Sequence, residues 1–417
     1  MNINGQTLGL RRMGPADAAS QPGIGCRNGG ACLCLALSLC LSAPALGQES
    51  ETNTAPVTPA INILHCGPFD LFPQVAAGVT YDDNIFIRDT NPQSDLVWLL
   101  SPGFELAAGD YNEREISFAS IKYAPAFVLF TDHSVNDAID HDASLQAQWH
   151  PARVNLGLQQ RIGIYSGSLV EAGNRVDRRL YDTELKAASE ISPKTGLEFV
   201  GTQSINDYES FNSFNEWTAA GWLNYSLTEK THAGAGVTAG FVDNLKGANQ
   251  TYQQGLVRMT YQVAGKVDLR GSAGAEVRQF EDDPRDRLDG IFSLGLTYHP
   301  LERTEIKLDA FRRTQSSVAL TDQDYTITSL SAGLRQGFLA KYAATLDGGY
   351  NHLDYLARTT SIDATRIDDY FFVRLGLQWQ ATDRALAGVY YQYRKNDSND
   401  AFSFENNQLG VNASYRF

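Results

Sequence analysis

Seven histidines are the residues with the clearest potential for acid–base chemistry or metal binding. They are scattered along the chain as His65, His133, His141, His150, His232, His299 and His352. No two of them stand four residues apart, as the paired ligands of a helical zinc-protease motif do, and no Gly-x-Ser-x-Gly nucleophile motif occurs. We therefore expect no catalytic residues, no metal site and no cofactor. An enzyme that gathers its site from separate strands stays open as an alternative.

Three acidic clusters have side chains that suit calcium: Asp82–Asn84, Glu281–Asp283 and Asn396–Asp400. None has the alternating carboxylate pattern and the glycine of a calcium-binding loop. We interpret them as solvated surface loops. No glycine-rich phosphate loop or basic patch occurs, and the formal net charge is −14. The sequence therefore predicts no nucleic-acid partner.

Basic residues are the third group of side chains that could carry a function, and their positive charges suit the attraction of anions rather than catalysis. In the second half of the chain they alternate with apolar residues, at Arg258, Arg270, Arg278, Lys307, Arg313, Arg335, Arg374, Arg394 and Arg416. Acidic residues at equivalent positions are fewer, namely Asp268, Glu276, Asp309 and Asp347. If these positions line one water-filled channel, its wall favours anionic solutes. Tyr390 and Phe372 have the same parity and suit stacking on sugar rings.

The alternation itself is the two-residue period of β-strands. In the last strand, Leu409, Val411, Ala413, Tyr415 and Phe417 share one face. Tight turns recur at Gly109–Arg114, His150–Ala152, Ser192–Thr195, Thr228–Thr231, Ala264–Lys266, His299–Arg303, Leu339–Lys341 and Ala381–Arg384. Longer acidic or Asn-rich loops lie between them, including Glu281–Asp289, Asp354–Asp369 and Asn396–Phe404. With a first strand at Gln74–Ile87 and a last at Ser403–Phe417, we expect about 18 strands (16–18).

Many antiparallel strands, with short turns at one end and longer loops at the other, are typical of a transmembrane outer-membrane β-barrel. The predicted fold class is therefore all-β, and the barrel must close because lipid leaves the backbone of an open edge unsatisfied. No run of 18 apolar residues follows the N-terminal region, which excludes a helical membrane protein. A soluble propeller or solenoid is the alternative, but units of two long strands favour the barrel. Aromatic residues near the short turns are expected at the lipid–water boundary: Trp149, Trp222, Tyr225, Tyr261, Tyr298, Trp379 and Tyr415.

Residues 1–47 have the pattern of a signal peptide. Arginines precede an apolar run from Ala31 to Leu41, and small residues follow it. We expect cleavage before Gln48, with cleavage after Ala45 as the alternative and Met13 as an alternative start. Because residues 1–47 contain three arginines and one aspartate, their removal changes the net charge from −14 to −16.

The mature chain then divides into two parts. Residues 48–72 are expected to be a flexible periplasmic leader, and residues 73–417 the transmembrane barrel. Cys66 is the single cysteine left after cleavage, so no internal disulfide is expected. We expect the protein in the outer membrane with its N-terminus in the periplasm.

Two segments carry a family resemblance. One is Gly78-Val79-Thr80-Tyr81-Asp82-Asp83-Asn84-Ile85-Phe86, and the other runs from Arg394 through Asn396–Asn399 to Tyr415-Arg416-Phe417. They resemble the family of β-barrel porins associated with exopolysaccharide export (beta-barrel porin 2-like). The resemblance covers most of the mature chain and implies an outer-membrane location, a role in polysaccharide passage and no catalytic residues. Tyr415 and Phe417 are also similar to the terminal signal that the barrel-assembly machinery reads.

The sequence thus predicts an outer-membrane channel for polar or anionic saccharides, or a component of exopolysaccharide export. Its expected partners are outer-membrane lipid, the barrel-assembly machinery and polysaccharide export components. A non-conducting structural or assembly barrel is the second hypothesis, and an outer-membrane lipase or protease the third. The loops with Glu281–Asp289 and Asp354–Asp369 are predicted to face outside the cell, and the turn at Ala381–Arg384 to face the periplasm.

Overall fold

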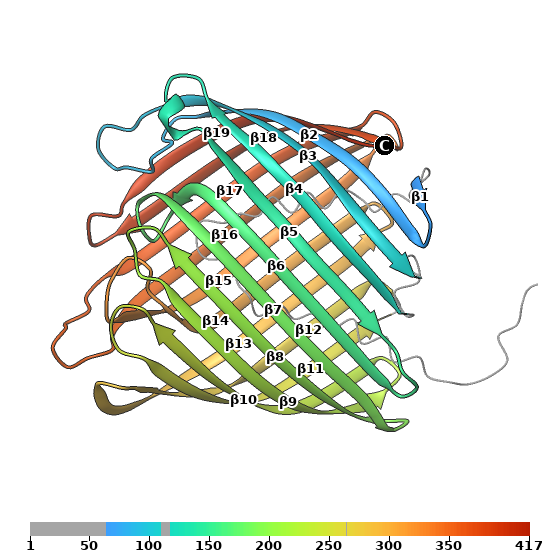
Figure 1. The fold of residues 1–417 in the computed structure, drawn as a ribbon, viewed down its shortest axis with the longest axis vertical. Coiled ribbons are helices and arrows are strands. Elements are labelled where there is room, and N and C mark those ends of the chain that lie inside the picture. The colour runs from blue at the N-terminus through green and yellow to red at the C-terminus, as the bar shows by residue number, and fades with distance from the viewer. Residues whose placement is uncertain (1–63, 110–116, 264) are drawn as a thin grey trace, which may run out of the picture. The chain divides into compact units, whose positions relative to one another are not determined.

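A closed antiparallel barrel is formed by strands β2 to β19 (Figure 1). The computed structural model describes residues 64–109, 117–263 and 265–417. Each strand pairs with its sequence neighbours, and β19 pairs with β2, which confirms the predicted count of 18 strands. The strands are β2 Phe69–Asp82, β3 Asp95–Gly109, β4 Phe118–Phe130, β5 Ala138–Trp149, β6 Val154–Leu169, β7 Asn174–Ser192, β8 Thr195–Tyr208, β9 Phe214–Thr228, β10 Thr231–Asn244, β11 Gln250–Val263, β12 Val267–Phe280, β13 Asp283–Leu301, β14 Thr304–Ser316, β15 Gln323–Phe338, β16 Tyr342–Ala357, β17 Ile367–Gln380, β18 Ala385–Ser398 and β19 Phe404–Arg416.

Two short elements accompany the barrel strands. Strand β1 (Leu64–Cys66) pairs with the first residues of β2, and the 3-10 helix η1 (Ser134–Asn136) lies between β4 and β5. The barrel therefore starts at Phe69, four residues before the predicted boundary at residue 73. Residues 1–63, which include the predicted signal peptide and most of the leader, lie outside the described residues. No described helix is long and apolar enough to cross a membrane.

The alternation of side chains follows the predicted parity. Leu409 and Val411 on β19 are 58% and 52% exposed on the outer surface, whereas Asn406 on the same strand is fully buried. An outer surface of exposed leucine, valine and aromatic side chains suits lipid, and the polar parity faces the lumen. Six of the seven aromatic residues expected at the lipid boundary are exposed outward. Trp222 is the exception and was wrongly assigned, because its parity on β9 turns it inward, where it is 8% exposed.

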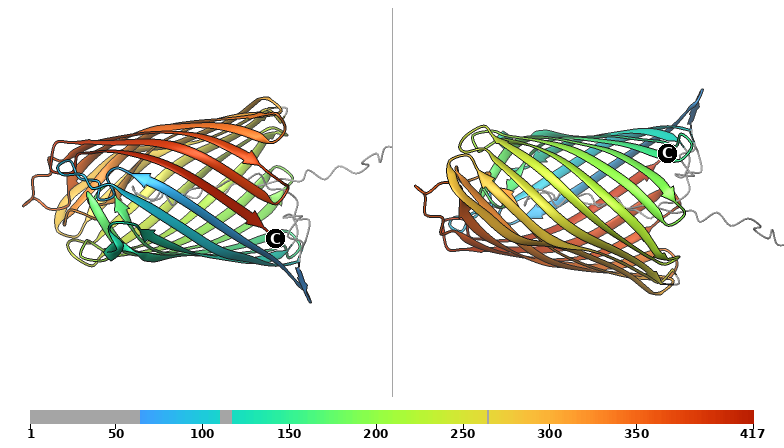
Figure 2. Two further views of the ribbon diagram at one scale, coloured as in Figure 1. Left: turned by 90° about the horizontal axis from the view of Figure 1, so that it is seen from above. Right: turned by 90° about the horizontal axis from the view of Figure 1, so that it is seen from below.

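The two ends of the barrel differ. Figure 2 shows that β1 and the C-terminus lie at one end, which we call the turn end; the opposite end is the loop end. The predicted tight turns connect strands at the turn end, although residues 110–116 and 264 of the first and fifth lie outside the described residues. The first strand ends at Asp82 rather than at Ile87, because the chain leaves the sheet there and Ile87 has a left-handed φ of 47°.

The predicted loop Glu281–Asp289 is wrong in extent. Only Glu281 and Asp282 connect β12 to β13, and the strand β13 continues from Asp283. Its charges form ion pairs along one strand face, Arg285–Asp283 at 2.6 Å and Arg287–Asp289 at 2.5 Å. Because side chains two residues apart point to the same face of a strand, a charged segment can pair its own charges and stay extended.

The Asp82-Asp83-Asn84 segment joins the first barrel strand to the last. The Asp82 carboxylate accepts hydrogen bonds from the side chains of Asn406 and Gln408 on β19, at 2.6 and 2.8 Å. Asp83 accepts two from Asn407, both at 2.7 Å. Asp82 and Asn84 are buried, so the expectation that this cluster is a solvated loop is wrong. The segment seals the seam where β2 meets β19.

Candidate functional site: the barrel lumen

Seven of the nine basic residues predicted to line the lumen are candidates for solute selection: Arg258, Arg270, Arg278, Arg313, Arg335, Arg374 and Arg394. The structure shows what each of them contacts. Arg258 on β11 forms an ion pair with Glu198 of β8 at 2.9 Å. Its guanidinium also lies 4.2 Å from the centre of the Trp222 ring. Glu198 is additionally 3.4 Å from Lys186 of β7. The positive charge of Arg258 is therefore largely balanced by a carboxylate that the sequence argument did not count.

Arg278 on β12 is even more strongly enclosed. It pairs with Glu276 at 2.8 Å and with Asp324 at 3.7 Å, and it donates to the Gln250 side chain at 2.8 Å. Its guanidinium lies 4.6 Å from the centre of the Tyr252 ring. Arg278 is 3% exposed, so its structural contribution is large and its charge is poorly placed to meet a solute.

The remaining predicted arginines also contact other side chains of the wall. Arg270 pairs with Asp268 at 2.7 Å, and Arg394 donates twice to Asn406 beside the seam. Arg313 and Arg374 lie over the rings of Phe311 and Tyr390, at 4.8 and 4.2 Å. Arg335 donates to Gln378 at 3.1 Å and has no carboxylate partner among the described residues.

Opposite these arginines, the wall formed by β5 to β9 carries carboxylates. By strand parity, the lumen face of these strands has three basic side chains, Arg161, Arg178 and Lys186, and twice as many carboxylates: Asp140, Asp142, Asp182, Glu184, Glu198 and Glu216. The excess of basic residues counted on the later strands is therefore not a property of the whole lumen. The barrel order places β7 diametrically opposite β16, so the lumen has a more acidic side and a more basic side. The acidic side was not predicted, because parity was assigned only to the later strands.

At the loop end, a contact crosses the barrel. The loop of residues 170–173 joins β6 to β7, and residues 317–322 join β14 to β15, eight strands further around. Glu171 Oε1 accepts hydrogen bonds from Ser317 Oγ at 2.7 Å and from the backbone N–H groups of Val318 and Ala319 at 2.8 and 3.2 Å. We call this arrangement the crossing contact. It narrows the loop end of the lumen.

Several buried groups support the crossing contact. The backbone oxygen of Glu171 accepts a bond from Arg366 at 2.9 Å, and Arg366 pairs with Asp368. Val170 packs in a buried cluster with Ile87, Tyr370 and Phe404, which come from three other segments of the loop end. Gly173 has a φ of 60°, and a Cβ there would stand 3.0 Å from the Phe402 ring. The loop is thus fitted into its place rather than free in solvent.

Glu171 itself is 2% exposed. Burial raises the pKa of its carboxyl above the ordinary value, although the bonds from Ser317, Val318 and Ala319 act in the opposite direction. The sequence analysis did not single out this residue. The sequence does contain a pattern that points to Glu171: it is a single carboxylate within the short apolar stretch Leu169–Ala172, which Gly173 follows.

Among the described residues, no group of three or more His, Cys, Asp or Glu side chains is arranged to hold a metal ion. The lumen therefore offers guanidinium groups, carboxylates, amides and aromatic rings. Groups of these kinds can form hydrogen bonds, ion pairs and stacking contacts with polar molecules.

Comparison with known proteins gives a match to one family model and a set of similar solved structures. No curated protein matches the sequence. Similar solved structures include OccAB4 of Acinetobacter baumannii, with 12% identity, a TM-score of 0.45, and coverage of 83% of this chain and 98% of that one. OpdK of Pseudomonas aeruginosa, solved with vanillate, has 11% identity, a TM-score of 0.46, and coverage of 83% and 99%. OccK2 (OpdF) of the same organism has 12% identity, a TM-score of 0.46, and coverage of 83% and 98%.

The family match concerns the C-terminal part of the barrel. It begins within β11 and runs to the terminal phenylalanine, so it includes the basic side of the lumen and strand β19 of the seam. The chain is a closed antiparallel barrel of 18 strands, and its residues 257–417 match the family described as "Putative beta-barrel porin 2", the family that the sequence resembles.

Proposed function

We propose that the protein is an outer-membrane channel that passes polar solutes, among them anionic saccharides, in exopolysaccharide export. The observation that carries this proposal is the polar lumen of a closed 18-strand barrel, which is wide enough for an aqueous channel. Arg335 and Arg374 lie on one side of it, and Asp182 and Glu184 have lumen parity on the other. A carboxylated sugar would move along the basic side.

The stacked arginines support this choice of solute. A guanidinium that lies over an aromatic ring keeps its N–H edge directed sideways, where it can donate to carboxylate or hydroxyl oxygens. Arg374 over Tyr390 and Arg313 over Phe311 are pairs of this kind, and each arginine also has a further contact within the protein. Because the opposite wall is acidic, we expect only a modest overall preference for anions.

The proposal extends to location and partners. Residues 1–47 would be removed on export, and the turn end would face the periplasm, so that the longer connections face outside. Tyr415 and Phe417, whose rings are 4.9 Å apart at the turn end, would be read by the barrel-assembly machinery. Lipid would cover the apolar outer surface, and export components would supply the polysaccharide.

A non-conducting structural barrel is the second candidate. The crossing contact favours it, because Glu171 joins opposite sides of the loop end through three hydrogen bonds. In that case the contact would close the lumen permanently rather than narrow it.

Swelling of proteoliposomes separates the two candidates. Vesicles with the full chain should swell in isotonic glucose and glucuronate, and swelling in glucuronate should decrease when Arg335 and Arg374 are both replaced by serine. Vesicles that swell no faster than protein-free vesicles with either solute would refute the channel. The Glu171→Ala variant, tested beside the wild type, shows whether the crossing contact limits the rate.

A further inference from the structure

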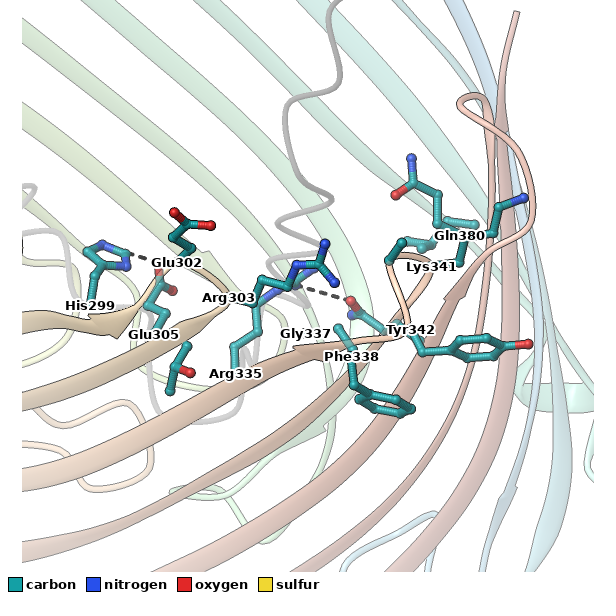
Figure 3. A pocket seen from close by; sticks show the side chains of 15 residues that line it. His299, Glu302, Arg303, Glu305, Arg335, Gly337, Phe338, Lys341, Tyr342 and Gln380 are labelled. Atoms are coloured by element: carbon teal, nitrogen blue, oxygen red, sulfur yellow. Dashed lines mark hydrogen bonds and ion pairs between the residues drawn. The ribbon is translucent and has the colours of Figure 1, made fainter.

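A polar cavity of about 330 Å³ lies at the turn end of the barrel (Figure 3). Its lining comes from the turn-end parts of strands β13 to β18 and from the β13–β14 and β15–β16 connections. Figure 3 shows Arg303 and Arg335 in the middle, with His299 and Glu305 to one side and Lys341 to the other. Glu305, Arg335 and Gln378 have the parity that faces the lumen, so the cavity opens toward the path of a solute.

The cavity has more positive charge than its own carboxylates balance. Arg303, Arg335 and Lys341 line it together with Glu302 and Glu305. Glu305 is already paired with Lys307, at 2.9 Å. Neither Arg303 nor Arg335 has an ion pair in the part of the chain that the structure describes, and Lys341 Nζ donates only to a backbone oxygen, that of Ala381, at 3.3 Å. Two guanidinium groups and an ammonium group are therefore available to an anion.

The neutral groups of the cavity restrict what that anion can be. Gln378 and Gln380 present side-chain amides, and the Gln378 oxygen accepts from Arg335 at 3.1 Å, which holds the guanidinium in place. Amides and guanidinium groups together form hydrogen bonds with hydroxyl groups and, in a bidentate manner, with carboxylates. The Glu302 and Glu305 carboxylates oppose a compact dianion but accept bonds from hydroxyl groups. The lining therefore suits a hydroxyl-rich sugar that carries no more than one carboxylate on each ring.

From these contacts we propose that the cavity binds a carboxylated sugar residue, a uronic acid unit, at the turn end of the lumen. Arg335 and Arg303 would bind the carboxylate, and Gln378, Gln380 and Glu305 would bind the ring hydroxyls. Its volume lies at the lower end of the range for small-molecule sites, which suits one or two sugar units. This inference rests on the proposed channel function, and it adds the class of substrate and the place in the lumen where that substrate binds.

The test measures binding rather than transport. Full-length protein in detergent is titrated with digalacturonate and, separately, with the neutral disaccharide lactose, by isothermal calorimetry. We expect saturable binding of digalacturonate that weakens with added salt, and at least about tenfold weaker binding of lactose. Arg335→Gln and the exposed Lys341→Gln should each weaken digalacturonate binding, the former by about tenfold or more. Lys230→Gln, which changes an exposed lysine of another turn-end connection, is the matched control and should bind as the wild type does.

Equal affinity for lactose and digalacturonate, no binding at millimolar concentrations, or wild-type affinity in both cavity variants would each overturn the proposal. Lys341 is exposed and makes no buried contact, so its variant stays informative if Arg335→Gln fails to fold. The binding measurement requires no conduction. A channel that conducts but does not bind digalacturonate would therefore refute this site alone, and a protein that binds but does not conduct would refute the channel alone.

Discussion

Replacing Asp82 by alanine should open the seam between the first and last barrel strands at the loop end. Asp82 pairs with Gln408 at the last position of the β2–β19 ladder. Its carboxylate accepts one bond from the backbone N–H of Asn84 and two from side chains of β19, those of Asn406 and Gln408. Asn406 is fully buried, so without Asp82 its side-chain amide keeps only longer bonds, to Asp83 at 3.3 Å and to the Asn84 backbone oxygen at 3.5 Å.

The size of the effect follows from the bonds that cross the seam. A hydrogen bond to a charged group contributes about 1.5–3 kcal/mol, and an unsatisfied buried donor adds to the loss. Two such bonds give a loss of about 3 kcal/mol in the free energy of unfolding, which is roughly a hundredfold in the unfolding equilibrium. The Asp82→Asn variant keeps one acceptor oxygen, so its loss should be about half as large.

The assay is equilibrium urea unfolding of the full chain in lipid vesicles, followed by tryptophan fluorescence. Asp89→Ala is the matched control, because Asp89 is an exposed carboxylate in the same connection between β2 and β3. The control should unfold at the wild-type urea concentration, and Asp82→Ala at a clearly lower one. Equal midpoints for Asp82→Ala and Asp89→Ala would refute the idea that this segment seals the barrel.

Three further predictions concern the loop end and the C-terminus. Because burial raises the pKa of Glu171, the crossing contact is most stable below the ordinary carboxyl pKa and weakens as the pH rises through the raised value. The conductance of the wild type should therefore rise with pH. A Glu171→Gln variant with the same dependence of conductance on pH would contradict this. Deletion of Phe417 should reduce the amount of folded, heat-modifiable barrel in outer membranes, and wild-type amounts would count against the assembly signal. A tag inserted between residues 359 and 365 should be labelled on intact cells, whereas labelling only after lysis would reverse the proposed orientation.

The fold was predictable because its signal repeats. A period of two along every strand and a tight turn after every pair of strands indicate a barrel even where single turns are uncertain. Strand ends were less predictable, since they depend on partners distant in sequence. The segment Asp283–Asp289 shows this, because charges that indicate a loop instead pair along one face of a strand. The inward position of Trp222 follows from strand parity alone, so it could have been predicted from the sequence.

The site was predictable only in part. Parity predicts arginines on the lumen face, but it cannot show which of them contact carboxylates of strands far along the chain. Arg258 and Glu198 are 60 residues apart in sequence, and Glu171 and Ser317 are 146 residues apart. Contacts at such separations depend on how the barrel closes and on which loops fold inward. The sequences of two neighbouring strands do not show how the barrel closes or which loops fold inward.

The most direct test of a water-filled lumen with two differently charged sides is the reversal potential of the purified full-length protein in planar bilayers, under a salt gradient. We expect stepwise currents with a modest anion preference. Replacing Arg335 and Arg374 by serine should shift the reversal potential toward cations, and replacing Asp182 and Glu184 by serine should shift it toward anions. Absence of current from both the wild type and Glu171→Ala, or a reversal potential that neither double variant changes, would contradict the account.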